Sequence, residues 1–188
     1  MNKKKVILVT DGDKTAGQAV AKAGEDLELN VIFKSQGVPT PYSGEELIEL
    51  ITEVDDEPVV VMVDDNGERE VGPGERALRR ILEAGKTEVL GVLAVASNTK
   101  EAEGIIPDIS ITKEGKVVKN PPVNKEGDLE PATHVVLEGD TVDVLNEFSD
   151  LLIVGVGDLG KMEGKDNLSA GAPITKQGLQ EILARSGE

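Results

Sequence analysis

The sequence of 188 residues contains no cysteine and a single histidine, His134. The lack of cysteine excludes disulfide bonds, thiolate metal sites and cysteine nucleophiles together. One histidine allows at most one histidine-based catalytic site. His134 stands at the start of a short apolar run, where a strand edge or a loop is the usual place for such a residue. No feature of the sequence by itself demonstrates catalysis.

Aromatic residues are also scarce, at 2% of the chain: Phe33, Tyr42 and Phe148, with no tryptophan. The core must therefore be built from valine, isoleucine, leucine and alanine. A stacking platform for single-stranded nucleic acid or sugars is not expected, because almost no rings are present to form one.

Long hydrophobic runs are missing as well. The stretch from Leu151 to Val156 is among the longest, far short of the roughly 20 residues that a membrane-spanning helix needs. The basic N-terminus is followed only by Val6 to Val9 before Asp11 interrupts the run, which is not the pattern of a signal peptide. We therefore expect a soluble, cytoplasmic protein that associates with a membrane only through a partner.

Charge is strongly one-sided, with 36 acidic against 20 basic residues and a net charge of −16. Such a surface repels a phosphate backbone, so nucleic-acid binding is disfavoured. It permits divalent cations or a basic partner, although solubility alone also explains it.

Hydrophobic periodicity predicts the fold. Apolar runs typical of buried strands alternate with amphipathic segments typical of helices, joined by short links. This alternation favours a three-layer, doubly wound α/β fold of the flavodoxin or Toprim kind, with a mostly parallel sheet of about five strands, in one domain spanning residues 1–188. The predicted strands cover residues 6–9, 31–33, 59–63, 89–95 and 151–156. The predicted helices cover residues 15–27, a segment capped by Ser43 and Glu46, a segment from about Glu75, one beginning near Thr141 and capped by Asp140, and residues 174–183.

The alternation of apolar strands and amphipathic helices does not continue through residues 107–131. Two short β-prone segments, 109–112 and 117–118, flank Glu114-Gly115, which predicts a β-hairpin. The polar, proline-rich stretch that follows is expected to be an exposed loop. We therefore expect this region to be an excursion from the main sheet.

Aspartates follow three of the predicted strands. Asp11 and Asp13 come after the first strand, Asp64 and Asp65 after the third, and Asp158 after the fifth. Ligands of open α/β sheets bind outside the carboxyl ends of the strands, so adjacency of the first and third strands would bring four carboxylates together. Such a cluster suits Mg²⁺ or Ca²⁺. Helix caps, turns or a partner contact explain the same residues, and these alternatives stay open.

Several weaker motifs lie in loops. Gly72, Gly74 and Glu75 precede a predicted helix, where an anion could bind, but the phosphate-loop ending of Lys-Ser/Thr is missing. Ser97 and Asn98 follow the fourth strand and fit a helix cap better than a nucleophile. Together with Asp158, these residues are candidate loop or partner contacts. The spacing of Gly155, Gly157 and Gly160 matches a dinucleotide fingerprint but lacks a following βαβ unit, so no organic cofactor is predicted.

Two family resemblances bear on function. An Asp-x-Asp-x-x-x-Gly pattern after a strand is similar to Toprim domains and would make Asp11 and Asp13 Mg²⁺ ligands, but no strand carrying a catalytic glutamate precedes it. Nearly the whole chain resembles the soluble form of stage V sporulation protein AE. The segments that carry this resemblance are VILVTDGD (6–13), GVPTPYSGEE (37–46), VMVDDNG (61–67), GPGE (72–75), VASNT (95–99), LEGDTVD (137–143) and GVGDLGKM (155–162).

The sporulation resemblance implies an accessory role and does not imply an enzyme activity. Members of that family belong to the SpoVA machinery of endospore-forming bacteria, which moves calcium dipicolinate into the developing spore and releases it at germination. It implies a soluble accessory subunit beside membrane-channel subunits and a thiolase-like soluble partner, peripheral to the spore inner membrane. The alternative is a metal-dependent ligand-binding protein or hydrolase that uses Asp11, Asp13, Asp64 and Asp65.

Overall fold

A computed structural model describes residues 3–67, 71–98 and 103–187. Its centre is a seven-stranded sheet in the order β2-β3-β1-β4-β7-β5-β6, in which every neighbouring pair is parallel except β5 and β6. The strands are β1 (Lys4–Val9), β2 (Asn30–Val31), β3 (Val59–Met62), β4 (Thr87–Val95), β5 (Ile109–Ile111), β6 (Val117–Val118) and β7 (Ile153–Val156).

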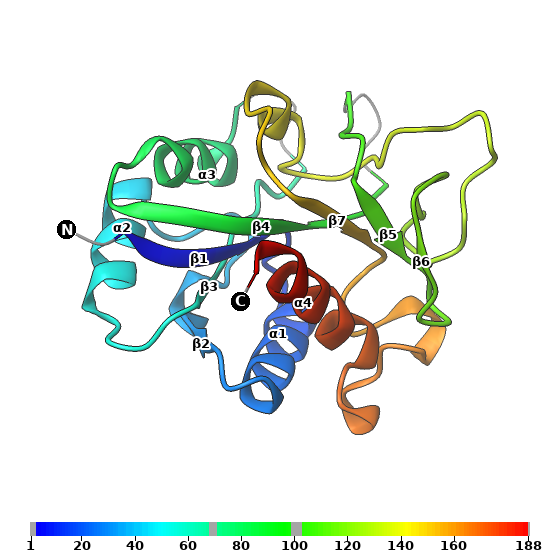
Figure 1. Ribbon diagram of the computed structural model, residues 1–188, viewed down its shortest axis with the longest axis horizontal. Coiled ribbons are helices and arrows are strands. Elements are labelled where there is room, and N and C mark those ends of the chain that lie inside the picture. Colours follow the sequence, from blue (N-terminus) through cyan, green and yellow to red (C-terminus); the bar gives the residue numbers. More distant parts are fainter. Residues whose placement is uncertain (1–2, 68–70, 99–102, 188) are drawn as a thin grey trace.

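Within the described residues, four α-helices cover the two faces of this sheet (Figure 1). They are α1 (Lys14–Asp26), α2 (Gly44–Glu53), α3 (Pro73–Glu83) and α4 (Pro173–Ser186). On β1, Val6 and Leu8 pack into the core beneath α2 and α3, whereas Ile7 and Val9 pack into the core beneath α1 and α4. Because side chains of a strand alternate between faces, a continuous apolar run is needed to fill both cores. The predicted three-layer α/β fold with a mostly parallel sheet is confirmed.

Strands β1 and β3 are direct neighbours, as the argument for an aspartate cluster requires. Val9 pairs with Met62 on one side and with Leu93 of β4 on the other, so the ends of all three strands lie at one edge. After β1 the chain turns to the face covered by α1, and after β3 it turns to the face covered by α3. This change of direction creates a crevice at the carboxyl ends of the strands. The order differs from that of flavodoxin, because β1 lies between β3 and β4, whereas in flavodoxin it lies between β2 and β3.

The hairpin at residues 107–131 is part of the sheet rather than an excursion from it. Strand β5 pairs in parallel with β7, and β6 pairs antiparallel with β5, so the sheet has seven strands instead of about five. Only the segment after β6 leaves the sheet, and it folds back through a bridge between Val123 and Leu129. Strands β5 and β6 are short, and β5 pairs with β7 about 40 residues further along the chain, a contact that local sequence does not predict.

Several predicted elements differ from the structure, and the fifth predicted strand, 151–156, begins two residues later, at Ile153. The segment after Thr141 forms a 3₁₀-helix (η2, Asp143–Glu147) instead of an α-helix, and Val142 rather than Asp140 is its cap residue. Thr141 has a left-handed backbone, φ 64°, which excludes it from a right-handed helix. The Asp140 carboxylate accepts the Gly67 N–H instead of capping a helix. The second strand is also shorter than predicted, because a 3₁₀-helix (η1, Phe33–Ser35) begins at Phe33. The capping box of Ser43 and Glu46 on α2 is confirmed.

Candidate functional site

A crevice of about 360 Å³ opens at the carboxyl ends of β1, β3, β4 and β7. Carboxylates, amides, hydroxyls and two lysines dominate its lining, and we call it the acidic crevice. Its polar side chains are Thr10, Asp11, Asp13, Asp64, Asn66, Ser97, Asn98, Lys125, Asp140, Asp158 and Lys161. They come from loops far apart in the sequence, as expected for a site at the switch point of a doubly wound sheet.

The loop after β1 supplies the first two carboxylates. Gly12 holds this loop against β3, since its N–H donates to Asp64 Oδ2 at 2.9 Å. A Cβ atom at Gly12 would lie 2.3 Å from the carbonyl oxygen of Gly37, so only glycine fits. Asp13 caps α1 by accepting the Ala16 N–H at Oδ1, 2.8 Å away. The helix-cap interpretation of Asp13 is therefore correct, but it occupies only one of the two carboxylate oxygens.

Three carboxylates meet in the acidic crevice. One oxygen from each of Asp11, Asp13 and Asp158 lies within 4.8 Å of the other two. The sequence placed Asp158 only among candidate contacts, whereas the structure brings it into the cluster. Oxygen atoms at this spacing can share one hard cation such as Mg²⁺ or Ca²⁺.

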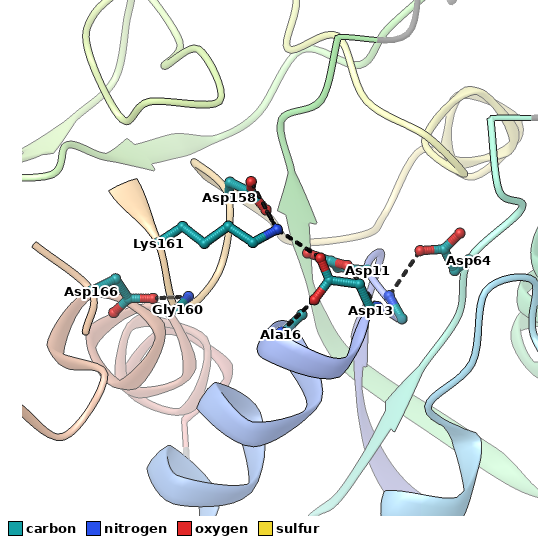
Figure 2. A network of polar contacts seen from close by, with 9 residues as sticks. Asp11, Asp13, Ala16, Asp64, Asp158, Gly160, Lys161 and Asp166 are labelled. Atoms are coloured by element: carbon teal, nitrogen blue, oxygen red, sulfur yellow. Dashed lines mark hydrogen bonds and ion pairs between the residues drawn. The ribbon is translucent and has the colours of Figure 1, made fainter. Parts of the chain in front are cut away.

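Lys161 lies between two of these carboxylates (Figure 2). Its Nζ donates to Asp13 Oδ2 at 2.7 Å and lies 3.1 Å from Asp158 Oδ2. Burial alone would raise the pKa of Asp13, but the hydrogen bonds from Lys161 and Ala16 outweigh burial and hold that pKa below its usual value. The same carboxylates raise the pKa of Lys161 against the opposing effect of burial. Both groups are therefore charged at neutral pH.

The pKa values of Asp11 and Asp64 are shifted in the opposite direction, upward. Burial raises the pKa of Asp11 to about 7, and the nearby charges of Asp13, Asp64 and Asp158 act in the same direction. Burial likewise raises the pKa of Asp64 to about 6, although the N–H groups of Asn66 and Gly12 donate to it. The acidic crevice therefore contains two carboxyl groups, Asp11 and Asp64, whose pKa values lie well above the ordinary aspartate value.

Asp65 does not line the acidic crevice, unlike its neighbour Asp64. Its carboxylate accepts the N–H of Gly74 at 2.6 Å and the N–H of Glu75 at 3.0 Å, which caps the start of α3. A Cβ at Gly72 would approach Asp65 Oδ1 to 2.1 Å, so the glycine makes room for this cap. The structural role of Gly72, Gly74 and Glu75 is therefore to form this helix cap. An anion at the start of α3 would have to compete with the Asp65 carboxylate. Residues 68–70 of the same loop lie outside the described residues.

Ser97 and Asn98 both line the acidic crevice. The Ser97 hydroxyl accepts the Asp140 N–H at 2.9 Å, and Asp140 in turn accepts the Gly67 N–H at 2.6 Å. Sequence reasoning treated Asp140 as a helix cap and did not select Lys125 or Lys161. The one sequence signal for Lys161 is its place shortly after Asp158 in the glycine-rich segment that follows β7.

The structure is an α/β domain with a polar crevice at the switch point of its sheet. No helix within residues 3–67, 71–98 and 103–187 has both the length and the apolar content to cross a membrane. The family model for stage V sporulation protein AE1 matches residues 5–186, and the chain belongs to this family. Its role is therefore in sporulation, within the SpoVA system. Comparisons with curated proteins and with solved structures found no match.

Proposed function

We propose that this chain is a non-enzymatic accessory subunit of the SpoVA machinery, which takes part in moving calcium dipicolinate into the forespore and in releasing it at germination. The observation that carries the proposal is the family match, which extends over residues 5–186 and thus over every described element. The acidic crevice offers carboxylates and lysines for binding, and its lining contains no histidine that could act as a base toward Thr10 or Ser97.

Partners would hold the chain at the cytosolic face of the spore inner membrane. They would be the membrane-channel subunits and the thiolase-like soluble subunit of the same system. The net charge of −16 favours a basic docking surface on such a partner, because opposite charges steer association. Co-purification of the tagged chain with these subunits from sporulating cells would support this arrangement.

Spores that lack the chain provide the test. We expect them to contain less dipicolinate than wild-type spores and to release it more slowly when germination is triggered. Reintroduction of the wild-type chain should restore both quantities. Normal accumulation together with normal release in the deletion strain would overturn the proposal.

A second candidate function is divalent-cation-dependent binding of a small ligand, or hydrolysis of one, in the acidic crevice. The approach of Asp11, Asp13 and Asp158 to within 4.8 Å favours it. Calorimetric titration of Ca²⁺ or Mg²⁺ should give a binding isotherm with the wild type and a weaker one with Asp13→Asn, which keeps the helix cap because asparagine caps as well as aspartate. Asp65→Asn is the control outside the crevice. Equal isotherms for wild type and Asp13→Asn, or no heat from either, would reject this candidate.

A further inference from the structure

The sequence contains a single Asn-Gly pair, Asn66-Gly67, which lies in the loop after β3. Such a pair is chemically labile in water, because glycine has no side chain to keep its backbone nitrogen away from the preceding carboxamide. In this reaction the Gly67 nitrogen loses its proton to water and forms a bond to Asn66 Cγ, and Nδ2 takes up a proton and leaves as ammonia. Water then opens the resulting succinimide ring at either carbonyl carbon. The product is aspartate or isoaspartate at position 66.

Both residues of the pair are exposed to solvent, and Asn66 lines the acidic crevice. Water therefore reaches the atoms that react. The backbone of the pair, by contrast, is held at both of its N–H groups. The Asn66 N–H donates to Asp64 Oδ1 at 2.7 Å, and the Gly67 N–H donates to Asp140 Oδ2 at 2.6 Å. The nitrogen that must attack Asn66 is thus bonded to a carboxylate that lies 73 positions away in the chain.

The tertiary structure fixes the contact between Gly67 and Asp140 from both sides. Asn66 and Gly67 have left-handed backbones, with φ values of 59° and 67°, and form a tight turn after β3. Asp140 is itself fixed by Ser97, because the Asp140 N–H donates to Ser97 Oγ at 2.9 Å. The contact therefore connects the loops after β3 and β4 with the segment before η2, and it persists only while these three segments stay together.

The Asp140 carboxylate opposes the reaction at Gly67 rather than promoting it. As a base it is ineffective, since a backbone amide is a far weaker acid than a carboxylic acid and does not give up its proton to a carboxylate. The attacking form of Gly67 is the nitrogen without its proton, which carries negative charge. A carboxylate 2.6 Å away repels that charge, whereas it stabilises the protonated nitrogen through a charge-assisted hydrogen bond. The contact therefore favours the unreactive state of the pair.

We propose that Asn66 is a site of spontaneous deamidation, and that the hydrogen bond from the Gly67 N–H to Asp140 holds the reaction back in the folded chain. Opening of this contact would convert Asn66 to aspartate or isoaspartate and add a negative charge beside Asp64. Isoaspartate also lengthens the backbone by a methylene group, which displaces the Gly67 N–H from Asp140. A modified chain therefore has a more acidic crevice with an altered rim, whether or not the crevice binds a cation.

The experiment is incubation of the full chain at neutral pH over several days, with deamidation at each asparagine measured by mass spectrometry of proteolytic peptides. Asp140→Ala removes the acceptor and should deamidate at Asn66 at least about tenfold faster than the wild type, the factor expected for loss of a charge-assisted hydrogen bond. Asp140→Asn keeps an acceptor oxygen without the charge and should give an intermediate rate. Asp143→Ala is the matched control, because Asp143 accepts the Gly104 N–H at 2.9 Å and does not line the crevice.

The wild type unfolded in urea gives the rate of the unprotected pair and should be the fastest sample. A folded wild type that deamidates at Asn66 as fast as the unfolded chain would overturn the proposal. Equal rates in wild type and Asp140→Ala would overturn the role of Asp140, and so would an equal gain in Asp143→Ala. A gain confined to Asn66 supports the proposal, whereas a simultaneous gain at Asn30 in β2 would trace the effect to global unfolding and contradict the assignment to this one contact.

Discussion

The Lys161 ammonium lies 2.7 Å from the Asp13 carboxylate, although the two residues stand 148 positions apart in the sequence. Asp13 caps the start of α1, and Lys161 follows β7, so this contact joins the loops after the first and the last strand of the chain, which flank β4 in the sheet. The same carboxylate caps α1 through its other oxygen. One side chain therefore holds a helix in place and takes part in the candidate binding site.

Stability should fall as the pH rises from about 4 to about 7. Asp11, with its pKa raised to about 7, keeps its proton in the folded state after the unfolded chain, with an ordinary value of 3.8, has lost it. The stabilisation is fully present below the unfolded pKa and is lost as the pH passes through the folded pKa, with a slope of at most about 1.4 kcal/mol per pH unit from this group. Urea unfolding of wild type and Asp11→Asn across this range should show a shallower slope in the variant. Identical slopes would show that Asp11 is ionised throughout.

Two buried serines should respond to alanine with opposite signs. The hydroxyl of Ser35 donates to the Ile32 carbonyl at 2.7 Å and accepts the Met62 N–H at 2.9 Å, so Ser35→Ala should destabilise the fold by about 1–3 kcal/mol. The hydroxyl of Ser110 on β5 is fully buried without a partner among the described residues, so Ser110→Ala should be neutral or stabilising by up to about 1 kcal/mol. Chemical denaturation of both variants measures the difference. A large loss of stability in Ser110→Ala would reveal a partner for its hydroxyl.

Replacement of the Asp166 carboxylate should destabilise the fold far more than replacement of an exposed carboxylate. It is fully buried and accepts three backbone N–H groups and the Thr175 hydroxyl, so Asp166→Ala leaves four donors unsatisfied. We expect a loss of at least about 3 kcal/mol, measured as the free energy of unfolding in urea. Asp26→Ala removes only exposed ion pairs with Lys22 and Lys176 and should change stability by less than about 1 kcal/mol. Similar losses in the two variants would contradict this reading of Asp166.

The sequence was sufficient to predict the layers of the fold and the edge of the sheet that carries the site. Continuous apolar runs such as Val6 to Val9 require cover on both faces, and this requirement determines the three layers. The aspartates after β1 and β3 had to lie at the same edge once those strands were neighbours. The hairpin's place in the sheet was not predictable in this way, because β5 has only three residues and its partner β7 follows some 40 residues later.

The exact membership of the site could not be predicted from local sequence. Asp64 and Asp65 are adjacent, yet side chains of an extended segment alternate in direction, so Asp64 lines the crevice and Asp65 caps α3. Asp140 looked like a cap in sequence, but the left-handed backbone of Thr141 prevents a helix from starting there. Lys125 enters the crevice through tertiary contacts without any local sequence pattern, and the only local signal for Lys161 is its place in the glycine-rich segment after β7.

The dipicolinate content of spores in which Asp11→Asn and Asp158→Asn together replace the wild-type residues tests the central claim most directly. The double variant loses two of the three converging carboxylates, while asparagine keeps the size and shape of each side chain. We predict that such spores contain clearly less dipicolinate than wild-type spores, at equal levels of the chain, whereas spores with Lys176→Gln match the wild type. Wild-type dipicolinate content in the double variant would contradict a role of the acidic crevice in the SpoVA system.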